Sequence, residues 1–267
     1  MTKRKVIILI MAMIFLLAGC SNNESNDEAN SGYNHGDEIV EMSDEEVELL
    51  CSIYVNEDGI REGKLHDYQQ QALEEFRMAK SYLQEKYPGY VYNFYLLSPS
   101  DRFDETTEIE FAIDESNGYY TVRVELVDDE YVITDNFFGY VLEPAFDDML
   151  EKKLREAGLS SFGVYTNLSG FVGRDIDAET TAEELLVSGD EIKKDITVWV
   201  DMLNTEETEN QRIAALVENT VRELKIYGGH RVYFDEGIVE SCPTFWDLVE
   251  YRKKDNLVSI GFNTFDL

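Results

Sequence analysis

The sequence has few of the residues that cross-link or break a fold. Its 267 residues include only three cysteines, four prolines and three histidines. Three cysteines cannot supply the disulfide framework of a small secreted domain, so stability has to come from hydrophobic cores. The length is sufficient for one large domain or two small ones with such cores.

Basic residues are also scarce. The chain has 23 Lys and Arg against 55 Asp and Glu, which gives a formal net charge of −32. A protein that binds nucleic acid needs a basic surface to contact the phosphates, so nucleic acid is excluded as a partner. The same charge repels anionic lipid headgroups, so we do not expect the protein surface itself to hold the chain on a membrane.

A long apolar run occurs only at the N-terminus, where Lys3, Arg4 and Lys5 precede an unbroken stretch from Val6 to Leu17. This order is typical of a secretory signal peptide. The run would form a helix of roughly 18 Å at 1.5 Å per residue, which is short for a bilayer core of about 30 Å. We therefore expect the residues that follow to be exported.

The signal ends in the segment Leu17-Ala18-Gly19-Cys20, which resembles the lipobox of bacterial lipoproteins. In that family the cysteine thiol receives a diacylglyceryl group, and signal peptidase II cleaves just before the cysteine. The resemblance covers the first 20 residues, and the rest of the chain is similar to uncharacterised Gram-positive lipoproteins without a motif of a named family. It implies that residues 1–19 are removed and that lipid on Cys20 anchors the protein outside a membrane.

Cleavage removes three basic residues and no acidic one, so 20 basic residues remain against 55 acidic ones, a net charge of −35. Residues 20–43 are acidic and polar with few apolar side chains, which predicts a flexible tether. We expect residues 44–180 to form an α+β domain. Residues 181–267 form either a second module or a continuation of the same domain.

Local patterns predict an α+β fold of antiparallel sheets with packed amphipathic helices. Ser43 and Glu46 have the spacing of a capping box, and apolar residues recur in steps of three and four over 65–87. Alternating residues over 109–133 predict an antiparallel meander, and a second helix is expected from Pro144 to Ala157. Further strands are expected at 162–165, 196–200, 230–234 and 257–262, and further helices at 181–186, 209–224 and 245–251. The similar order of elements in the two halves indicates either two similar modules or one continuous domain.

Cys51 and Cys242 remain after Cys20 is lipidated, one near each end of the folded part. In an exported protein they could form a disulfide that closes a very long loop. They could equally be two separate buried thiols that act as small hydrophobes. The sequence leaves both alternatives open.

No catalytic, cofactor or metal motif is evident. The chain lacks a G-x-S-x-G elbow, a P-loop and a dinucleotide fingerprint. His35, His66 and His230 do not have the spacing of a helical metal site, and His230 fits a turn or strand end. Asp147 and Asp148 fit the start of the second helix, where negative charge is favourable. We therefore predict no catalytic, cofactor-binding or metal-binding residue.

These observations favour a non-enzymatic lipoprotein of the cell envelope that binds a protein or another envelope component. The alternatives are a solute-binding lipoprotein of a transporter and, third, an extracellular hydrolase. A solute receptor would have a deep cleft, an interaction protein an exposed apolar patch, and a hydrolase a pocket with convergent titratable groups.

Overall fold

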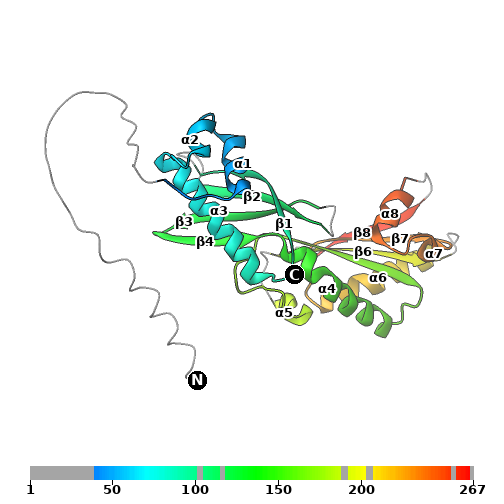
Figure 1. The fold of residues 1–267 in the computed structure, drawn as a ribbon. Helices are drawn as coiled ribbons and strands as arrows, with labels where there is room; N and C mark the ends of the chain where they lie inside the picture. Colours follow the sequence, from blue (N-terminus) through cyan, green and yellow to red (C-terminus); the bar gives the residue numbers. More distant parts are fainter. Residues whose placement is uncertain are drawn as a thin grey trace, which may run out of the picture. The chain divides into compact units, whose positions relative to one another are not determined.

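The computed structural model describes residues 39–100, 105–114, 118–187, 192–202, 207–253 and 257–264. The predicted signal peptide, Cys20, His35 and most of the predicted tether lie outside these ranges. The described residues form two four-stranded sheets with packed helices (Figure 1). The predicted α+β class is confirmed.

The first sheet is the predicted antiparallel meander. Its order is β1 (Tyr92–Ser98), β2 (Thr106–Ile113), β3 (Tyr120–Val127) and β4 (Glu130–Asp135). Asp128 and Asp129 connect β3 to β4 with φ angles of 51° and 65°, the left-handed conformation that suits a two-residue hairpin turn. Alternate residues of β2 and β3, such as Phe111 and Val122, are buried on one face. The helix α3 (Asp67–Lys86) covers this face, as the sequence pattern predicts.

Two short helices, α1 (Asp44–Ile53) and α2 (Glu57–Arg61), precede α3. The predicted capping box is present at α1. The Glu46 backbone N–H donates to Ser43 Oγ at 3.3 Å, and the Ser43 N–H donates to Glu46 Oε2 at 2.8 Å. Arg77 of α3 donates to Glu46 Oε1 at 2.7 Å, so the same carboxylate also holds α1 against α3.

The second sheet contains β5 (Phe162–Ser169), β6 (Lys193–Asp201), β7 (Gly229–Asp235) and β8 (Val258–Asn263) in chain order. β6 and β7 pair in parallel, whereas the sequence analysis expected antiparallel sheets. The parallel pair arises because α6 (Glu207–Glu223) connects the two strands, and a helical crossover returns the chain to the same end of the sheet.

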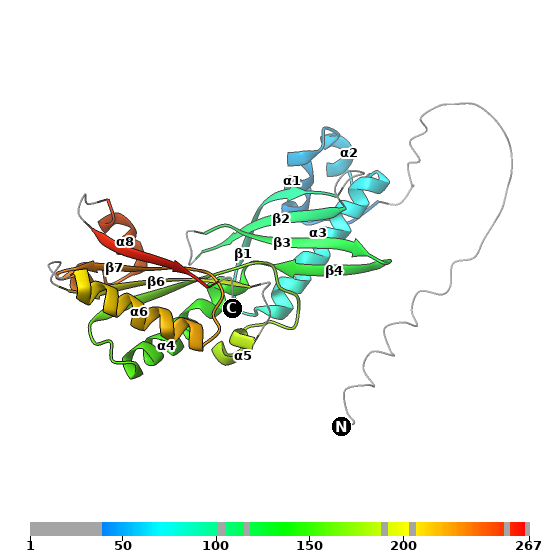
Figure 2. The same cartoon turned by 180° about the vertical axis from the view of Figure 1, so that it is seen from behind.

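Helices cover both faces of the second sheet (Figure 2). α4 (Phe138–Glu156) and α6 lie on one side, and α7 (Ile238–Ser241) and α8 (Phe245–Tyr251) lie on the other; α5 (Ala182–Val187) lies near α4. The strand alternation explains this arrangement, because Val198 and Val200 of β6 join the main core while Trp199 between them packs with α7 and α8.

The two sheets belong to one folded unit with a shared hydrophobic core. Residues 181–267 supply β6, β7 and β8 of the second sheet, and β5 of the same sheet precedes them. The chain passes from the first sheet to the second between β4 and α4, whereas the sequence analysis set the division at residue 180. β5 pairs along its whole length with β6 across this position, and such long-range pairing is not visible in local patterns.

A buried ion pair lies where the two sheets meet. Asp135 at the end of β4 forms an antiparallel bridge with Val172, which follows β5. Its Oδ2 lies 2.7 Å from Lys86 Nζ of α3, and the two side chains are 0% and 2% exposed. Lys86 also donates to the Gly173 carbonyl at 2.6 Å. This one pair thus connects α3, β4 and the segment after β5.

Cys51 and Cys242 are free thiols in this structure, which corresponds to the second of the two alternatives that the sequence leaves open. Cys51 in α1 packs against the main core, whereas Cys242 after α7 is buried in the cluster of Trp199, Tyr233, Ile238 and Leu248. The two cysteines therefore lie in different hydrophobic clusters, where each acts as a small hydrophobe.

Over the described ranges, no helix combines the length and the apolar character needed to cross a bilayer.

Candidate functional site

The candidate site begins with α4, which starts earlier than the sequence predicts. The Asp135 Oδ1 atom accepts hydrogen bonds from the backbone N–H groups of Phe137 at 2.9 Å and Phe138 at 3.1 Å, so it caps the helix start. Pro144, which was expected at the first position because proline is favoured there, lies in the second turn. Asp147 consequently lies well inside the helix, and its interpretation as a residue of the first turn is wrong.

α4 lies unusually close to β5, whose other neighbour is β6. A Cβ atom at Gly139 would come within 2.6 Å of the Leu168 carbonyl oxygen, so only glycine allows this approach. One turn later, Glu143 Oε1 accepts the backbone N–H of Leu168 at 3.1 Å, and its Oε2 accepts the Tyr165 hydroxyl at 3.4 Å. Glu143 thereby satisfies a backbone group on the free edge of the sheet.

Glu143 and Asp147 both hold a proton more strongly than ordinary carboxyl groups. Burial raises the pKa of Glu143 to about 7, although its hydrogen bonds with Leu168 and Tyr165 lower it. Burial also raises the pKa of Asp147 to about 7, the charges of Glu143 and Asp148 raise it further, and its interaction with Thr166 lowers it. The two groups are four residues apart on one helix, so they share a face.

These carboxyl groups open into a cleft of about 1000 Å³ between the start of β3, α4, β5 and α8. The size is at the upper end of the range for small-molecule sites. Aromatic side chains form much of its wall. The aromatic residues are Tyr119, Tyr120, Tyr140, Tyr165, Phe171 and Trp246.

Two of these rings are exposed at the rim, Tyr119 by 72% and Trp246 by 70%. The inner rings are held by neighbours. Tyr165 stacks on Phe245 of α8 with centroids 4.0 Å apart, and Tyr140 stacks on the buried Phe137 at 5.5 Å. The wall is thus fixed by packing, whereas the rim is accessible.

In comparisons with protein families, with curated proteins and with solved structures, no match to this chain was found. The chemistry of the cleft therefore has to be read from its own residues.

The cleft offers hydrogen-bond acceptors but no positive charge. Among the described residues that line it, none is Lys, Arg or His. Arg123 lies behind the wall, with its guanidinium 3.6 Å from the centre of the Phe171 ring and 2.8 Å from Glu108 Oε1. Its charge is thus already paired with a carboxylate.

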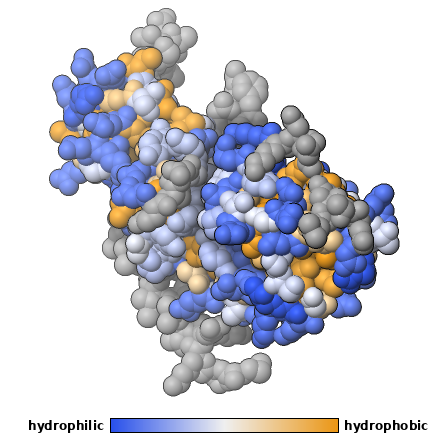
Figure 3. Space-filling view, turned by 90° about the vertical axis from the view of Figure 1, so that its right-hand side faces the viewer, coloured by the Kyte–Doolittle hydropathy of each residue, from blue (hydrophilic) through white to orange (hydrophobic). Residues whose placement is uncertain are grey.

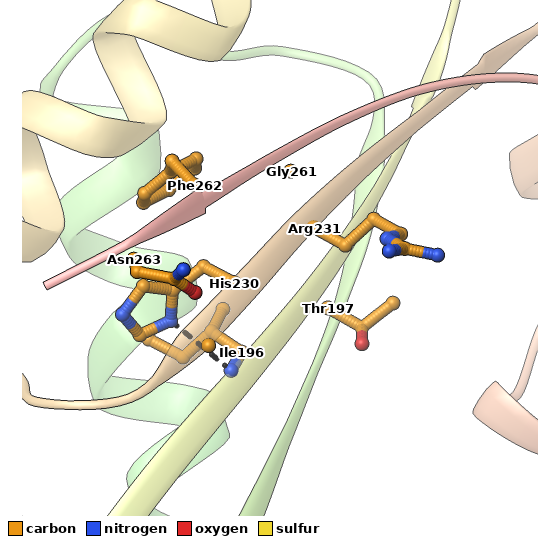
Figure 4. Close-up of a pocket in the computed structure, with 8 residues that line it drawn as sticks. Ile196, Thr197, His230, Arg231, Gly261, Phe262 and Asn263 are labelled. Carbon is orange, nitrogen blue, oxygen red and sulfur yellow. Dashed lines mark hydrogen bonds between the residues drawn. The ribbon is translucent and has the colours of Figure 1, made fainter.

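A second cavity, of about 410 Å³, surrounds His230 on β7 (Figure 4). The ring is buried; its Nδ1 accepts the Ile196 N–H at 3.3 Å, and its Nε2 lies 2.8 Å from Thr264 Oγ1. Burial lowers the pKa of His230 to about 4, so the ring is neutral at pH 7. Arg231 extends away from it. Both ring nitrogens are occupied by structural contacts, which leaves neither for a ligand.

The other residues singled out in the sequence do not converge on a site. His66 precedes α3, where its backbone N–H donates to Gln69 Oε1 at 2.9 Å. Within the part of the chain that the structure describes, no group of three or more His, Cys, Asp or Glu residues is placed to hold a metal ion. Glu143 and Asp147 were not predicted as site residues, because carboxylates are abundant throughout the chain. The sequence did contain one signal for them. Glu143 and Asp147 are four residues apart and directly follow the apolar residues Leu142 and Phe146, which indicates that both lie at the edge of the buried face of the helix.

The raised pKa values predict an unusual pH dependence of stability. Unfolded Glu and Asp lose their protons near pH 4, whereas folded Glu143 and Asp147 keep theirs to about pH 7. The folded state therefore binds more protons between these values, and the free energy of unfolding falls as the pH rises from 5 to 8. We expect this fall to be of the order of 2 kcal/mol for each carboxyl group. The double variant Glu143→Gln, Asp147→Asn should lose it.

Denaturant unfolding at pH 5 and pH 8 measures this difference. The exposed neighbour Asp148 provides the matched control, because Asp148→Asn removes one acidic charge from the same helix without removing a buried carboxyl. A double variant with the same pH dependence as the wild type would contradict the assignment.

Proposed function

We propose that this chain is a non-enzymatic lipoprotein of the cell envelope, held outside a membrane by lipid on Cys20, and that its cleft binds an envelope component or a solute. The lipobox resemblance supports the location. The cleft supports the binding role, and it is the observation that carries the proposal.

The exposed rim aromatics favour binding over a purely structural role. Tyr119 comes from the start of β3 and Trp246 from α8, so segments far apart in sequence place large rings at one opening. The face seen in Figure 3 is largely hydrophilic, with apolar residues gathered in patches. Aromatic side chains at a concave site supply much of the contact area in ligand recognition.

An extracellular hydrolase is the second candidate, and the convergence of Glu143 and Asp147 in one cleft is the observation in its favour. Glycosidases place two carboxyl groups on opposite sides of the bond that they cleave. Here both carboxyl groups come from one face of α4. This arrangement fits the recognition of a ligand from one side better than catalysis across a bond.

Tryptophan fluorescence can test the binding role. Trp246 is exposed at the rim, whereas Trp199 is 3% exposed and donates to the Cys242 carbonyl at 3.0 Å. We expect at least one ligand class among neutral saccharides, amino acids and organic ammonium ions to shift Trp246 emission and raise the melting temperature by several degrees. The emission change should disappear in Trp246→Phe.

Tyr119→Ala should weaken this binding at least tenfold, because it removes a rim ring. Tyr68→Ala is the control, since Tyr68 is also exposed, by 55%, but lies outside the cleft. If no ligand class changes either signal, the proposed binding role is wrong. If the protein hydrolyses a ligand and Glu143→Gln abolishes this hydrolysis, the second candidate function, an extracellular hydrolase, is correct instead.

A further inference from the structure

We propose that the cleft binds an organic cation, with a primary or quaternary ammonium group placed against Glu143 and Asp147 and enclosed by tyrosine rings. This inference rests on the proposed binding function and names its ligand class. Three features of the cleft carry it.

The first feature is an excess of unsatisfied acceptors at the base of the cleft. Asp147 Oδ1 is buried and accepts no hydrogen bond among the described residues, although the neighbouring Thr166 lowers the pKa of this carboxyl group. Pro144 has no N–H, so the Tyr140 carbonyl four residues earlier cannot receive the usual helical hydrogen bond from it. A buried acceptor without a donor is costly. A primary ammonium group offers both the donors and the charge that these oxygens lack, whereas a quaternary ammonium group offers the charge alone.

The second feature is the aromatic enclosure. Tyr165 donates to Glu143 at 3.4 Å, and Tyr120 and Asp147 line the same cleft. Tyr140 packs beside Tyr120, with ring centroids 5.8 Å apart. Tyrosine faces attract cations, and several faces around one point enclose a quaternary ammonium group.

The third feature is the charge around the cleft, which excludes other ligand classes. An anion would meet two carboxyl groups and no cation in the described lining. A purely apolar ligand would bury the Asp147 oxygen without a partner. The net charge of −32 attracts cations to the protein from a distance.

Binding should release protons. The charged and titratable groups around Glu143 and Asp147 are Tyr120 on β3, Tyr140 and Asp148 on α4, Tyr165 on β5, and Arg123 behind Phe171. A cation stabilises the ionised carboxylates, which are protonated below about pH 7 without it. The affinity should therefore rise about tenfold from pH 6 to pH 8.

Choline and its neutral isostere 3,3-dimethyl-1-butanol are the matched probes, with cadaverine as a primary amine. Titration calorimetry and Trp246 fluorescence should show that choline or cadaverine binds at least tenfold more tightly than the neutral isostere at pH 8. Glu143→Gln and Asp147→Asn should each weaken the binding at least tenfold. Asp148→Asn should change it less than twofold.

The inference would be overturned if neither choline nor cadaverine bound more tightly than the neutral isostere. Unchanged affinity in both Glu143→Gln and Asp147→Asn would also overturn it. Binding of a neutral saccharide with no binding of either cation would also overturn it while leaving the proposed binding function intact. If none of the probes and none of the ligand classes binds, both proposals fail.

Discussion

Replacing Asp135 with alanine should lower the free energy of unfolding by about 3–5 kcal/mol, the range for breaking a buried ion pair. Asp135 Oδ2 accepts hydrogen bonds from Lys86 and from the Tyr82 hydroxyl, both at 2.7 Å, and the Tyr87 hydroxyl lies 3.1 Å from Oδ1. Its Oδ1 also caps α4. The variant would leave the Lys86 ammonium buried without its counter-charge.

Burial already lowers the pKa of Lys86, although Asp135 opposes this effect. Without Asp135, the pKa of Lys86 should fall further, because only the charges of Asp175 and Asp177 then oppose the desolvation cost. We therefore expect the loss of stability caused by Asp135→Ala to be smaller at pH 9 than at pH 7, because a neutral amine is less costly to bury than an ammonium ion. Denaturant unfolding at pH 7 and pH 9 measures both effects.

A second ion pair supplies the control for Asp135. Arg174 lies 2.8 Å from Glu85 and connects α3 to the same segment after β5, but its side chain is 60% exposed. Arg174→Ala should cost less than about 1 kcal/mol, as is usual for a solvent-exposed pair. Similar losses for Arg174→Ala and Asp135→Ala would show that Asp135 does not lock the two sheets together.

Replacing Cys20 with alanine should abolish the cleaved, membrane-anchored form of the protein almost completely. Each buried CH₂ of an acyl chain contributes about 0.8 kcal/mol, and stable anchoring needs two such signals. The net charge of the remaining chain repels an anionic membrane surface, so it does not replace the lipid. The variant should accumulate either as uncleaved precursor or in the medium.

Labelling with a radioactive or clickable fatty acid, followed by membrane fractionation, measures this loss. Cys51→Ala is the control, because Cys51 packs against the folded core and should be neither lipidated nor needed for anchoring. A Cys20→Ala protein that is cleaved, labelled and anchored like the wild type would contradict the lipoprotein assignment.

The parts of the fold that depend on neighbouring residues were predictable. The Ser43–Glu46 capping box, the α3 stripe and the meander through Asp128 and Asp129 all follow from spacings of a few residues. The start of α4 was not predictable in this way, because Pro144 is favoured at a helix start and the true cap comes from Asp135. The parallel pairing of β6 with β7 likewise depends on a distant partner.

By itself the sequence determined the acidic composition, the α+β class and the resemblance of the N-terminus to a lipoprotein signal, because each depends on residue counts or on short-range patterns. Tertiary structure alone decided that Cys51 and Cys242 lie apart and that Glu143 and Asp147 share a cleft with rings from β3, β5 and α8. The physical reason is burial. A carboxyl group acquires a raised pKa only when distant segments exclude water from it, and no local pattern records which segments will do so.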